Sequence, residues 1–276
     1  MIKICITGNK GFIGKALQNK LESMGHVVVG IEKWIFERGK WQENLHEYLS
    51  LLKPDVVFHV GACSDTQNND VKEMMQQNVE STFIISDWCE FNSVPIIYSS
   101  SASIYGSSDA PETLYSWSKY IGEYFVNKCS GVSLRYFNVY GSYEIPKGKM
   151  ASVSCQSFFK HKNGESVKIF PKNPQRDFVY IEDVVSANIH AWQNYQSLKG
   201  GWYEVGSGEA RSFEDVLNIM NIPFEYADES EIPQNYQFYT KADPNKFMPN
   251  WTPKYNLETG LNEYVDLLKV SSLVVV

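Results

Sequence analysis

The stretch TGNKGFIG at residues 7–14 decides the fold of this 276-residue chain. It follows an apolar run at residues 2–7 that is typical of a buried strand, and it opens an amphipathic helical pattern. The spacing of Gly8, Gly11 and Gly14 suits a phosphate loop, in which glycines permit a tight turn, a close approach of backbone to a pyrophosphate, and contact between helix and strand. Because the N-terminus of such a helix faces the phosphates, the stretch predicts a dinucleotide site.

A carboxylate follows the second predicted strand, at residues 26–31. Glu32 stands where an acidic side chain accepts hydrogen bonds from a ribose 2′-hydroxyl and repels a 2′-phosphate. This favours NAD as the cofactor, but the nearby cations Lys33, Arg38 and Lys40 leave NADP as the alternative. The residues expected to contact the cofactor from these two segments are Gly8, Gly11, Phe12, Ile13, Gly14, Glu32 and Lys33.

Strand and helix patterns alternate through the first half of the chain. This alternation predicts an α/β fold, a Rossmann-type doubly wound parallel sheet covered by helices on both faces. Further strands are expected at 55–62, 94–101 and 131–137, with helices at 43–53, 71–91 and 115–129. The second half is less regular and predicts a smaller mixed α/β C-terminal substrate lobe. We expect the dinucleotide-binding domain at 1–139 and 178–198, and the substrate domain at 140–177 and 199–276.

Composition argues against several classes of function. The formal charge of −7 and the lack of a basic cluster argue against a nucleic-acid partner, and no apolar run approaches the length of a membrane span. The chain enters a strand pattern at once, so we expect no signal peptide. The five cysteines form no Cys-x-x-Cys pair, and the five histidines show no metal-ligand spacing. We therefore expect a cytoplasmic protein with reduced thiols, no metal site and no membrane partner.

A tyrosine and a lysine lie four residues apart in LYSWSKYIGEYF at 114–125. A helix places both side chains on one face, where a lysine can assist a tyrosine in proton transfer near neutral pH. The spacing alone does not identify such a group, because it occurs four times, at Tyr115/Lys119, Tyr124/Lys128, Tyr143/Lys147 and Tyr195/Lys199.

The order of several motifs adds the missing context. TGNKGFIG, HVGA, SSSASIYG, YSWSK, RYFNVYG and RDFVYIEDV follow one another from residue 7 to about residue 184. In this order they resemble the extended short-chain dehydrogenase/reductase family of nucleotide-sugar enzymes. Within that family, RYFNVYG followed by PKGKMASV and YQFYTKADPNKF is most similar to the branch of ADP-L-glycero-D-manno-heptose 6-epimerases.

The resemblance implies roles for individual residues. Tyr115 would be the acid/base, since only this pair follows a strand that ends in serine, and Lys119 would lower the pKa of Tyr115. Ser101 would hydrogen-bond the reacting oxygen. Lys147 would be a second proton donor, with Lys149 as the alternative. The remaining implied contacts are Gly61, Ala62 and Asn78, with Tyr115 and Lys119, for the cofactor, and Asn138, Arg176 and Tyr236 for the substrate.

The activity implied is that of an NAD(P)-dependent nucleotide-sugar epimerase, which transiently oxidises and re-reduces a carbinol carbon. A nucleotide-diphosphate sugar would be the substrate, and we expect a homo-oligomer. The alternatives are a 4-epimerase of a UDP- or GDP-sugar, a nucleotide-sugar reductase or dehydrogenase, and a non-catalytic NAD(P)-binding regulator. A 4,6-dehydratase is disfavoured, because Ala102 and Ser103 stand where that chemistry needs an Asp-Glu pair.

Overall fold

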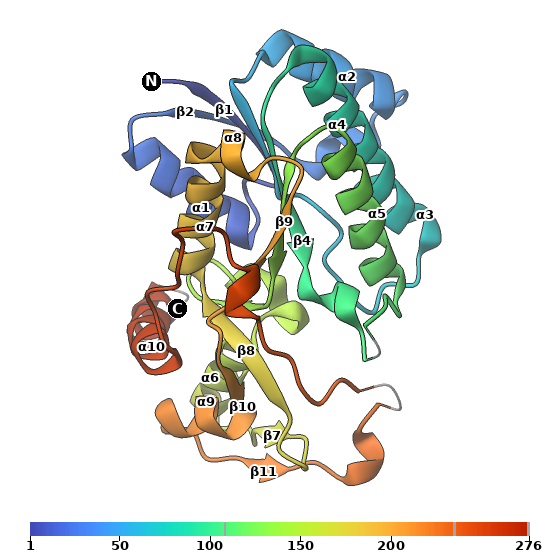
Figure 1. Cartoon of the computed structure of the whole chain (residues 1–276). Coiled ribbons are helices and arrows are strands. Elements are labelled where there is room, and N and C mark those ends of the chain that lie inside the picture. The colour runs from blue at the N-terminus through green and yellow to red at the C-terminus, as the bar shows by residue number, and fades with distance from the viewer. Residues whose placement is uncertain (108, 234–235, 275–276) are drawn as a thin grey trace.

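A sheet of six parallel strands lies at the centre of the larger lobe (Figure 1). The computed structural model describes residues 1–107, 109–233 and 236–274. In spatial order the strands are β2 (Val27–Ile31), β1 (Lys3–Thr7), β3 (Val56–His59), β4 (Ile96–Ser101), β5 (Val132–Tyr136) and β9 (Trp202–Val205). Every neighbouring pair is parallel, so the predicted doubly wound α/β fold is confirmed.

Helices cover both faces of this sheet. Successive side chains of a strand point to opposite faces, and those of β1 are buried on both. Ile4 and Ile6 pack with α1 (Phe12–Ser23) and α7 (Ile181–Gln193) in one buried cluster. Cys5 points the other way and packs in a second cluster with helices of the opposite face. These helices are α2 (Trp41–Leu52), α4 (Ser81–Asn92) and α5 (Leu114–Lys128). Figure 1 shows the two layers on either side of the sheet.

The strand order reverses direction between β1 and β3. The chain runs from β1 outward to β2 and then returns past β1 to β3. In open parallel sheets such a reversal leaves a crevice at the carboxyl ends of the two strands, and ligands bind there. The glycine loop follows β1 and the residues Gly61 and Ala62 follow β3, so both predicted cofactor segments border this crevice.

The helix predicted at 71–91 consists of three joined pieces. A short α3 (Val71–Met74) begins after Asp70, whose carboxylate accepts a hydrogen bond from the Glu73 backbone N–H at 3.0 Å. A π-helical segment, η2 (Met75–Glu80), then leads into α4. Such wide turns are rare and recur at functional sites. The wide turn here carries Asn78, one of the residues expected at the cofactor.

The smaller lobe extends from one end of the central sheet (Figure 1). Its three-stranded sheet has the order β10 (Ala210–Ser212), β8 (Gln175–Tyr180) and β6 (Asn138–Tyr140), and β7 (Lys168–Ile169) pairs with β11 (Glu225–Tyr226). Its helices are α6 (Val153–Lys162), α9 (Phe213–Ile219) and α10 (Leu257–Val274). Short helical turns occur in both lobes; they are η1 (Lys33–Glu37), η3 (Ala102–Tyr105), η4 (Ile145–Met150), α8 (Tyr195–Leu198), η5 (Glu229–Glu231) and η6 (Pro244–Lys246).

One strand lies on the other side of the expected domain boundary. β9 falls in the segment 199–276 that we expected in the substrate domain, but it pairs with β5 at the edge of the central sheet. The four residues of β9 show no alternation of apolar and polar side chains that would indicate this pairing. The position of β9 depends instead on the preceding α7, which crosses one face of the sheet. We keep the two-part division as a proposal and move β9 into the dinucleotide-binding part.

Two further findings concern the described part of the chain. No helix there is long and apolar enough to cross a membrane. Within the same residues, no group of three or more His, Cys, Asp or Glu side chains could hold a metal ion.

Replacement of Gly14 by alanine should destabilise the fold. A Cβ at Gly14 would overlap the carbonyl oxygen of Gly8 and the backbone of Asn9, neither of which is a flexible side chain. We expect Gly14→Ala to lower the free energy of unfolding by about 1–3 kcal/mol, the usual cost of overpacking, measured by urea denaturation. Gly39→Ala is the control, because a Cβ there meets nothing within 4 Å. Equal stability of both variants would contradict this view of the loop.

Candidate active site

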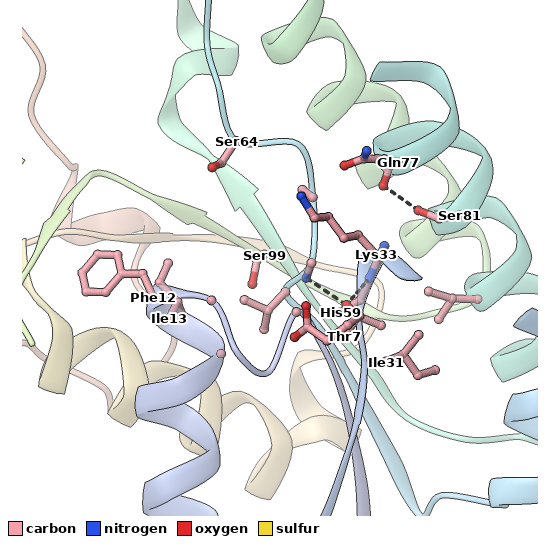
Figure 2. Close-up of a pocket in the computed structure, with 18 of the residues that line it drawn as sticks. Thr7, Phe12, Ile13, Ile31, Lys33, His59, Ser64, Gln77, Ser81 and Ser99 are labelled. Atoms are coloured by element: carbon pink, nitrogen blue, oxygen red, sulfur yellow. Dashed lines mark hydrogen bonds between the residues drawn. The ribbon is translucent and has the colours of Figure 1, made fainter. Parts of the chain in front are cut away.

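A cavity of about 310 Å³ occupies the crevice at the ends of β1 and β3. Figure 2 shows Phe12 and Ile13, at the head of α1, on one side of it and Gln77 and Ser81 on the other. The predicted site residues in its lining are Gly8, Gly11, Phe12, Ile13, Gly14, Glu32, Lys33, Gly61, Ala62, Tyr115, Lys119 and Lys147. Segments far apart in the sequence thus meet at one site.

The glycine loop forms a cradle that other residues would fill. Gly8 has φ +67°, a left-handed conformation, and a Cβ there would lie 2.7 Å from the Cα of Gly61. A Cβ at Gly11 would lie 3.2 Å from the Gly8 carbonyl oxygen, a tight but not impossible contact. Internal packing therefore excludes a side chain less strictly at Gly11 than at Gly14. This agrees with a role of Gly11 in the close approach of a ligand to the backbone.

The part of the cavity that Glu32 lines suits an adenosine. The Glu32 carboxylate lines it and accepts a hydrogen bond from the Lys10 backbone N–H at 2.7 Å, which holds the acid against the glycine loop. Ile35, Phe36 and Leu45 supply apolar surface beside it. A carboxylate for a ribose and apolar walls for a base are the groups that a dinucleotide requires, so the residues present fit NAD.

Asn78 braces the loop that follows β3. Its Oδ1 accepts from the Cys63 backbone N–H at 2.7 Å, and its Nδ2 donates to the Cys63 carbonyl at 3.0 Å and to the Ser118 hydroxyl at 2.9 Å. The Ser118 hydroxyl in turn donates to the Tyr115 carbonyl. Asn78 does not line the cavity itself, so it acts on this site by fixing the loop and the start of α5.

His59 joins the same framework as a neutral ring. The Thr82 hydroxyl donates to the Asn78 carbonyl at 2.6 Å, which leaves its oxygen to accept from His59 Nε2 at 2.8 Å. Nδ1 then accepts from the Thr7 hydroxyl at 2.8 Å, and Thr7 accepts from the Gly61 N–H (Figure 2). Burial, assisted by the charge of Lys119, lowers the pKa of His59 to about 3, so the ring stays uncharged.

Tyr115 and Lys119 begin α5 beside the cavity. Thr113 caps this helix in a reciprocal arrangement with Ser116, which fixes where the first turn starts. The Lys119 amino group lies 5.9 Å from the centre of the Tyr115 ring and donates to the Ser99 carbonyl at 2.8 Å. The side chains expected to form the acid/base pair therefore face one site.

The three serines that end β4 have different neighbours. The Ser99 hydroxyl lies 3.0 Å from the Tyr136 hydroxyl, and the Ser100 hydroxyl donates to Glu123 at 2.6 Å. The Ser101 hydroxyl accepts from the Ser103 backbone N–H at 3.1 Å and lies close enough to Tyr115 to lower its pKa. Of the three, Ser101 is thus the one whose side chain reaches the tyrosine.

The electrostatics of the pair differ from the expectation. Burial raises the pKa of Tyr115, and the nearby Ser101 hydroxyl only partly offsets this effect. Burial also lowers the pKa of Lys119 to about 7, against the opposing influence of Cys63 and Glu123. The predicted lowering of the Tyr115 pKa by Lys119 is therefore not found: Ser101 is the group that lowers this pKa, and desolvation disfavours the charged forms of both side chains.

Lys147 and Lys149 occupy different surroundings. The Lys147 amino group lies 5.3 Å from the centre of the Phe12 ring, and burial lowers its pKa. Its loop is fastened by the buried Glu144 carboxylate, which accepts from the Gly141 and Ser152 backbone N–H groups. The Lys149 side chain is 84% exposed. Of the two lysines, Lys147 is the one that lines the cavity.

The expected substrate residues lie in the smaller lobe, outside the cavity lining. Arg176 donates to the Gln175 carbonyl and lies 5.1 Å from the centre of the Tyr236 ring. The neighbouring Asp177 carboxylate does not pair with it and is instead held by the Ser207, Gly208 and Ala242 N–H groups. Asn138 donates to the Asp177 carbonyl at 3.2 Å, so its side chain already has a protein partner.

Sequence reasoning missed several residues near the site. Glu123, one helical turn after Lys119 on α5, forms a buried ion pair with Arg135, with 2.6 Å between their charged atoms. The signal available was a carboxylate four residues after Lys119, on the buried face of the helix. Phe170 was also missed; its ring packs edge-on against Tyr236, with centroids 5.1 Å apart. No spacing rule marks that aromatic residue.

A doubly wound sheet with a glycine loop at its reversal point, and with a Tyr–Lys pair beside it, defines a dinucleotide-dependent enzyme of the dehydrogenase/reductase class. The chain belongs to the NAD-dependent epimerase/dehydratase family, whose pattern matches residues 4–206. The family assignment made from the motifs is thereby confirmed, and so is NAD as the cofactor of the family.

Individual relatives agree with this assignment. The chain is 33% identical to an ADP-L-glycero-D-manno-heptose-6-epimerase of Brachyspira hyodysenteriae, in an alignment that covers 97% of this chain and 98% of that protein. The crystal structure of the Helicobacter pylori ADP-L-glycero-D-manno-heptose-6-epimerase superimposes with a TM-score of 0.83 at 28% identity, over 97% and 96% of the two chains. The Thermotoga maritima UDP-glucose 4-epimerase shares the fold, with a TM-score of 0.83 at 23% identity over 98% and 99%.

Replacement of Tyr115 by phenylalanine should remove turnover and leave the fold and cofactor binding intact. The phenol is the group that would exchange a proton with a sugar hydroxyl, and loss of a general acid/base usually costs about 10²–10⁴-fold in rate. The measurement is the turnover of nucleotide sugar together with the binding of NAD.

Tyr124→Phe is the matched control, because Tyr124 also precedes a lysine by four residues but is 65% exposed on the outer side of α5. A variant at Tyr124 that loses turnover while Tyr115→Phe keeps it would show that the wrong pair was chosen.

Proposed function

We propose that this protein inverts a carbinol carbon of ADP-glycero-manno-heptose, as an NAD-dependent 6-epimerase. The observation that carries the proposal is the position of two proton-transfer groups in one cavity. Tyr115 comes from α5, on one face of the sheet, and Lys147 lies over Phe12 at the head of α1, on the other face. An enzyme that must protonate an oxygen in two orientations needs donors on two sides.

The first half of the reaction would use Tyr115 and its neighbours. NAD, when bound, accepts a hydride from the carbinol carbon and later returns it. Tyr115 takes the proton of the sugar hydroxyl, and Ser101, which lies close enough to lower the pKa of the phenol, holds the same oxygen. A charged Lys119 nearby would favour the phenolate that this step needs.

The second half would require a different donor. To give the opposite configuration, the ketone must present its other face, and its oxygen then points away from Tyr115. Lys147 can supply the proton there, since burial lowers the pKa of its amino group toward the working range. Glu144 keeps the loop that carries it in place.

The smaller lobe offers groups suited to a nucleotide diphosphate. Arg176 has a carbonyl and aromatic rings as its described contacts, and burial lowers its pKa, as expected for a cation without an acidic partner. Phe170 and Tyr236 provide aromatic surface beside it. A cation next to aromatic rings suits a diphosphate joined to a base, and the two heptose epimerases support ADP-heptose as the choice.

Exposed aromatic side chains and free thiols bear on the assembly and the location of the protein. Large aromatic side chains are exposed along α4 and α5, which supports a homo-oligomer; they are Phe83, Trp117, Tyr120 and Tyr124. All five cysteines are free thiols, which supports a cytoplasmic enzyme.

A panel of nucleotide sugars tests the function. Protein reconstituted with NAD is incubated with ADP-glycero-manno-heptose, UDP-glucose and a GDP-sugar, and the products are followed by NMR. We expect the heptose to be epimerised without release of free NADH. Faster inversion of UDP-glucose would instead indicate a 4-epimerase, and accumulation of free NADH would indicate a net dehydrogenase.

Two arginine variants accompany the panel. Arg176→Gln should raise KM by roughly 10- to 100-fold, the loss expected for one charge-assisted hydrogen bond, with a smaller effect on kcat. Arg211→Gln is the control, since Arg211 is already paired with Asp215 and Glu258. An unchanged KM in Arg176→Gln would remove this residue from the substrate site.

Lys147→Met should affect one direction of reduction more than the other. With a substrate analogue already oxidised at the inverted carbon, we expect the variant to slow formation of one stereoisomer by about 10²–10⁴-fold and to spare the other. Tyr115→Phe should show the reverse bias. The yields of the two isomers are measured in single turnovers by NMR.

Lys149→Met is the control for this experiment, because its exposed amino group pairs only with Asp65, at 3.6 Å, among the described contacts. Equal loss of both isomers in Lys147→Met, or no loss of either, would leave a single-base enzyme.

A further inference from the structure

A buried carboxylate lies one helical turn beyond Lys119 on α5. Glu123 is 7% exposed, and its side chain accepts three hydrogen bonds from the two adjoining strands. The Ser100 hydroxyl donates to Oε1 at 2.6 Å, and Arg135 donates from Nε at 2.8 Å and from Nη2 at 2.6 Å. Two parallel bonds from one guanidinium fix both the position and the charge of a carboxylate.

Arg135 is itself held by residues that do not line the cavity. Its Nη1 donates to the Tyr105 hydroxyl at 3.0 Å, and its guanidinium stacks on the Trp202 ring at 3.8 Å from the centroid. The Tyr105 hydroxyl donates to Glu204, which also pairs with Lys246 at 3.4 Å. A buried guanidinium restrained on two sides has little freedom to leave Glu123.

Few other groups act on the charge of Lys119. Its amino group meets the Ser99 carbonyl and the faces of the Tyr98 and Tyr115 rings, at 5.0 and 5.9 Å. From the elements packed against α5, the titratable groups facing this part of the helix are His59, Cys63, Tyr98, Tyr105 and Arg135. His59 is neutral, and the phenols of Tyr98 and Tyr105 have raised pKa values, so they remain neutral too.

Cys63 and Glu123 are the two groups that oppose the desolvation of Lys119, and of these Glu123 is the carboxylate. We propose that Glu123 is a positioning residue: clamped by Arg135, it keeps the amino group of Lys119 charged beside the acid/base. The clamp matters because an unpaired carboxylate at this depth would itself take up a proton. The inference rests on the roles proposed above for Tyr115 and Lys119, but it concerns a property of the protein that exists without substrate.

The sign of the effect follows from the charges. Burial lowers the pKa of Lys119 to about 7, so its charge is present below that pH and is lost above it. A nearby negative charge favours the ammonium form, and its removal lowers the pKa further. Without Glu123, Lys119 would be mostly neutral at pH 7, and the phenolate of Tyr115 would lose its stabilising cation.

The test is the titration of Lys119 in the free protein, followed by NMR of isotope-labelled lysine side chains. The signal is assigned by its absence in Lys119→Met. Glu123→Gln should shift the titration midpoint down by about one pH unit, the effect of losing one close opposite charge. Glu123→Asp should restore part of the shift. The double variant Glu123→Gln/Arg135→Gln leaves no uncompensated cation, so a midpoint still below that of the wild type is expected if the carboxylate itself supports the charge of Lys119.

Asp183→Asn is the matched control. Asp183 is also buried and accepts hydrogen bonds only from the Lys254 and Tyr255 N–H groups among its described side-chain contacts, so its loss should leave the pKa of Lys119 unchanged. A wild-type midpoint in Glu123→Gln and in the double variant, or an equal shift in Asp183→Asn, would overturn the proposal.

This outcome is independent of the proposed reaction. A shifted midpoint with no epimerase activity in the wild type would contradict the function and keep the role of Glu123. An unshifted midpoint in an active epimerase would contradict the role of Glu123 and keep the proposed function.

Discussion

The close contact between the glycine loop and the end of β3 is the constraint on which the rest of the structure depends. Gly8 lies against the backbone of Gly61, and Gly14 lies against the Gly8 carbonyl, so no side chain fits at either place. This packing brings the N-terminus of α1 to the carboxyl ends of the parallel strands, at the point where their order reverses. The cavity, the bound carboxylate of Glu32 and the bracing by Asn78 all follow from that arrangement.

Burial dominates the electrostatics of the site. Desolvation raises the pKa of Tyr115 and lowers the pKa values of Lys119 and Lys147, so in each case the neutral form is favoured. The protein offsets this effect with a few placed groups, namely the Ser101 hydroxyl and the carboxylates of Glu123 and Glu144. Of Tyr115, Lys119 and Lys147, Lys119 is the one whose pKa is brought to about 7, close to the pH at which a proton-transfer group is most effective.

The local parts of this account were predictable from the sequence, and the long-range parts were not. The glycine loop and Glu32 follow from spacing along adjacent elements, because a strand, a turn and a helix position them without help from the rest of the chain. β9 could not be foreseen, since its place depends on pairing with β5 across about 65 intervening residues. The choice of Ser101 among three serines came from family resemblance, and only the fold shows that its neighbours face other partners.

The most direct test of the account follows the hydrogen on the inverted carbon. The proposed heptose substrate, deuterated at that carbon, is incubated with the NAD-loaded protein in ordinary water, and both epimers are analysed by NMR. Transient oxidation predicts a mixture of the two epimers, each retaining the deuterium, because the hydride returns to the carbon from which it came. Epimers that have exchanged deuterium for solvent hydrogen would contradict the account, as would a complete lack of inversion.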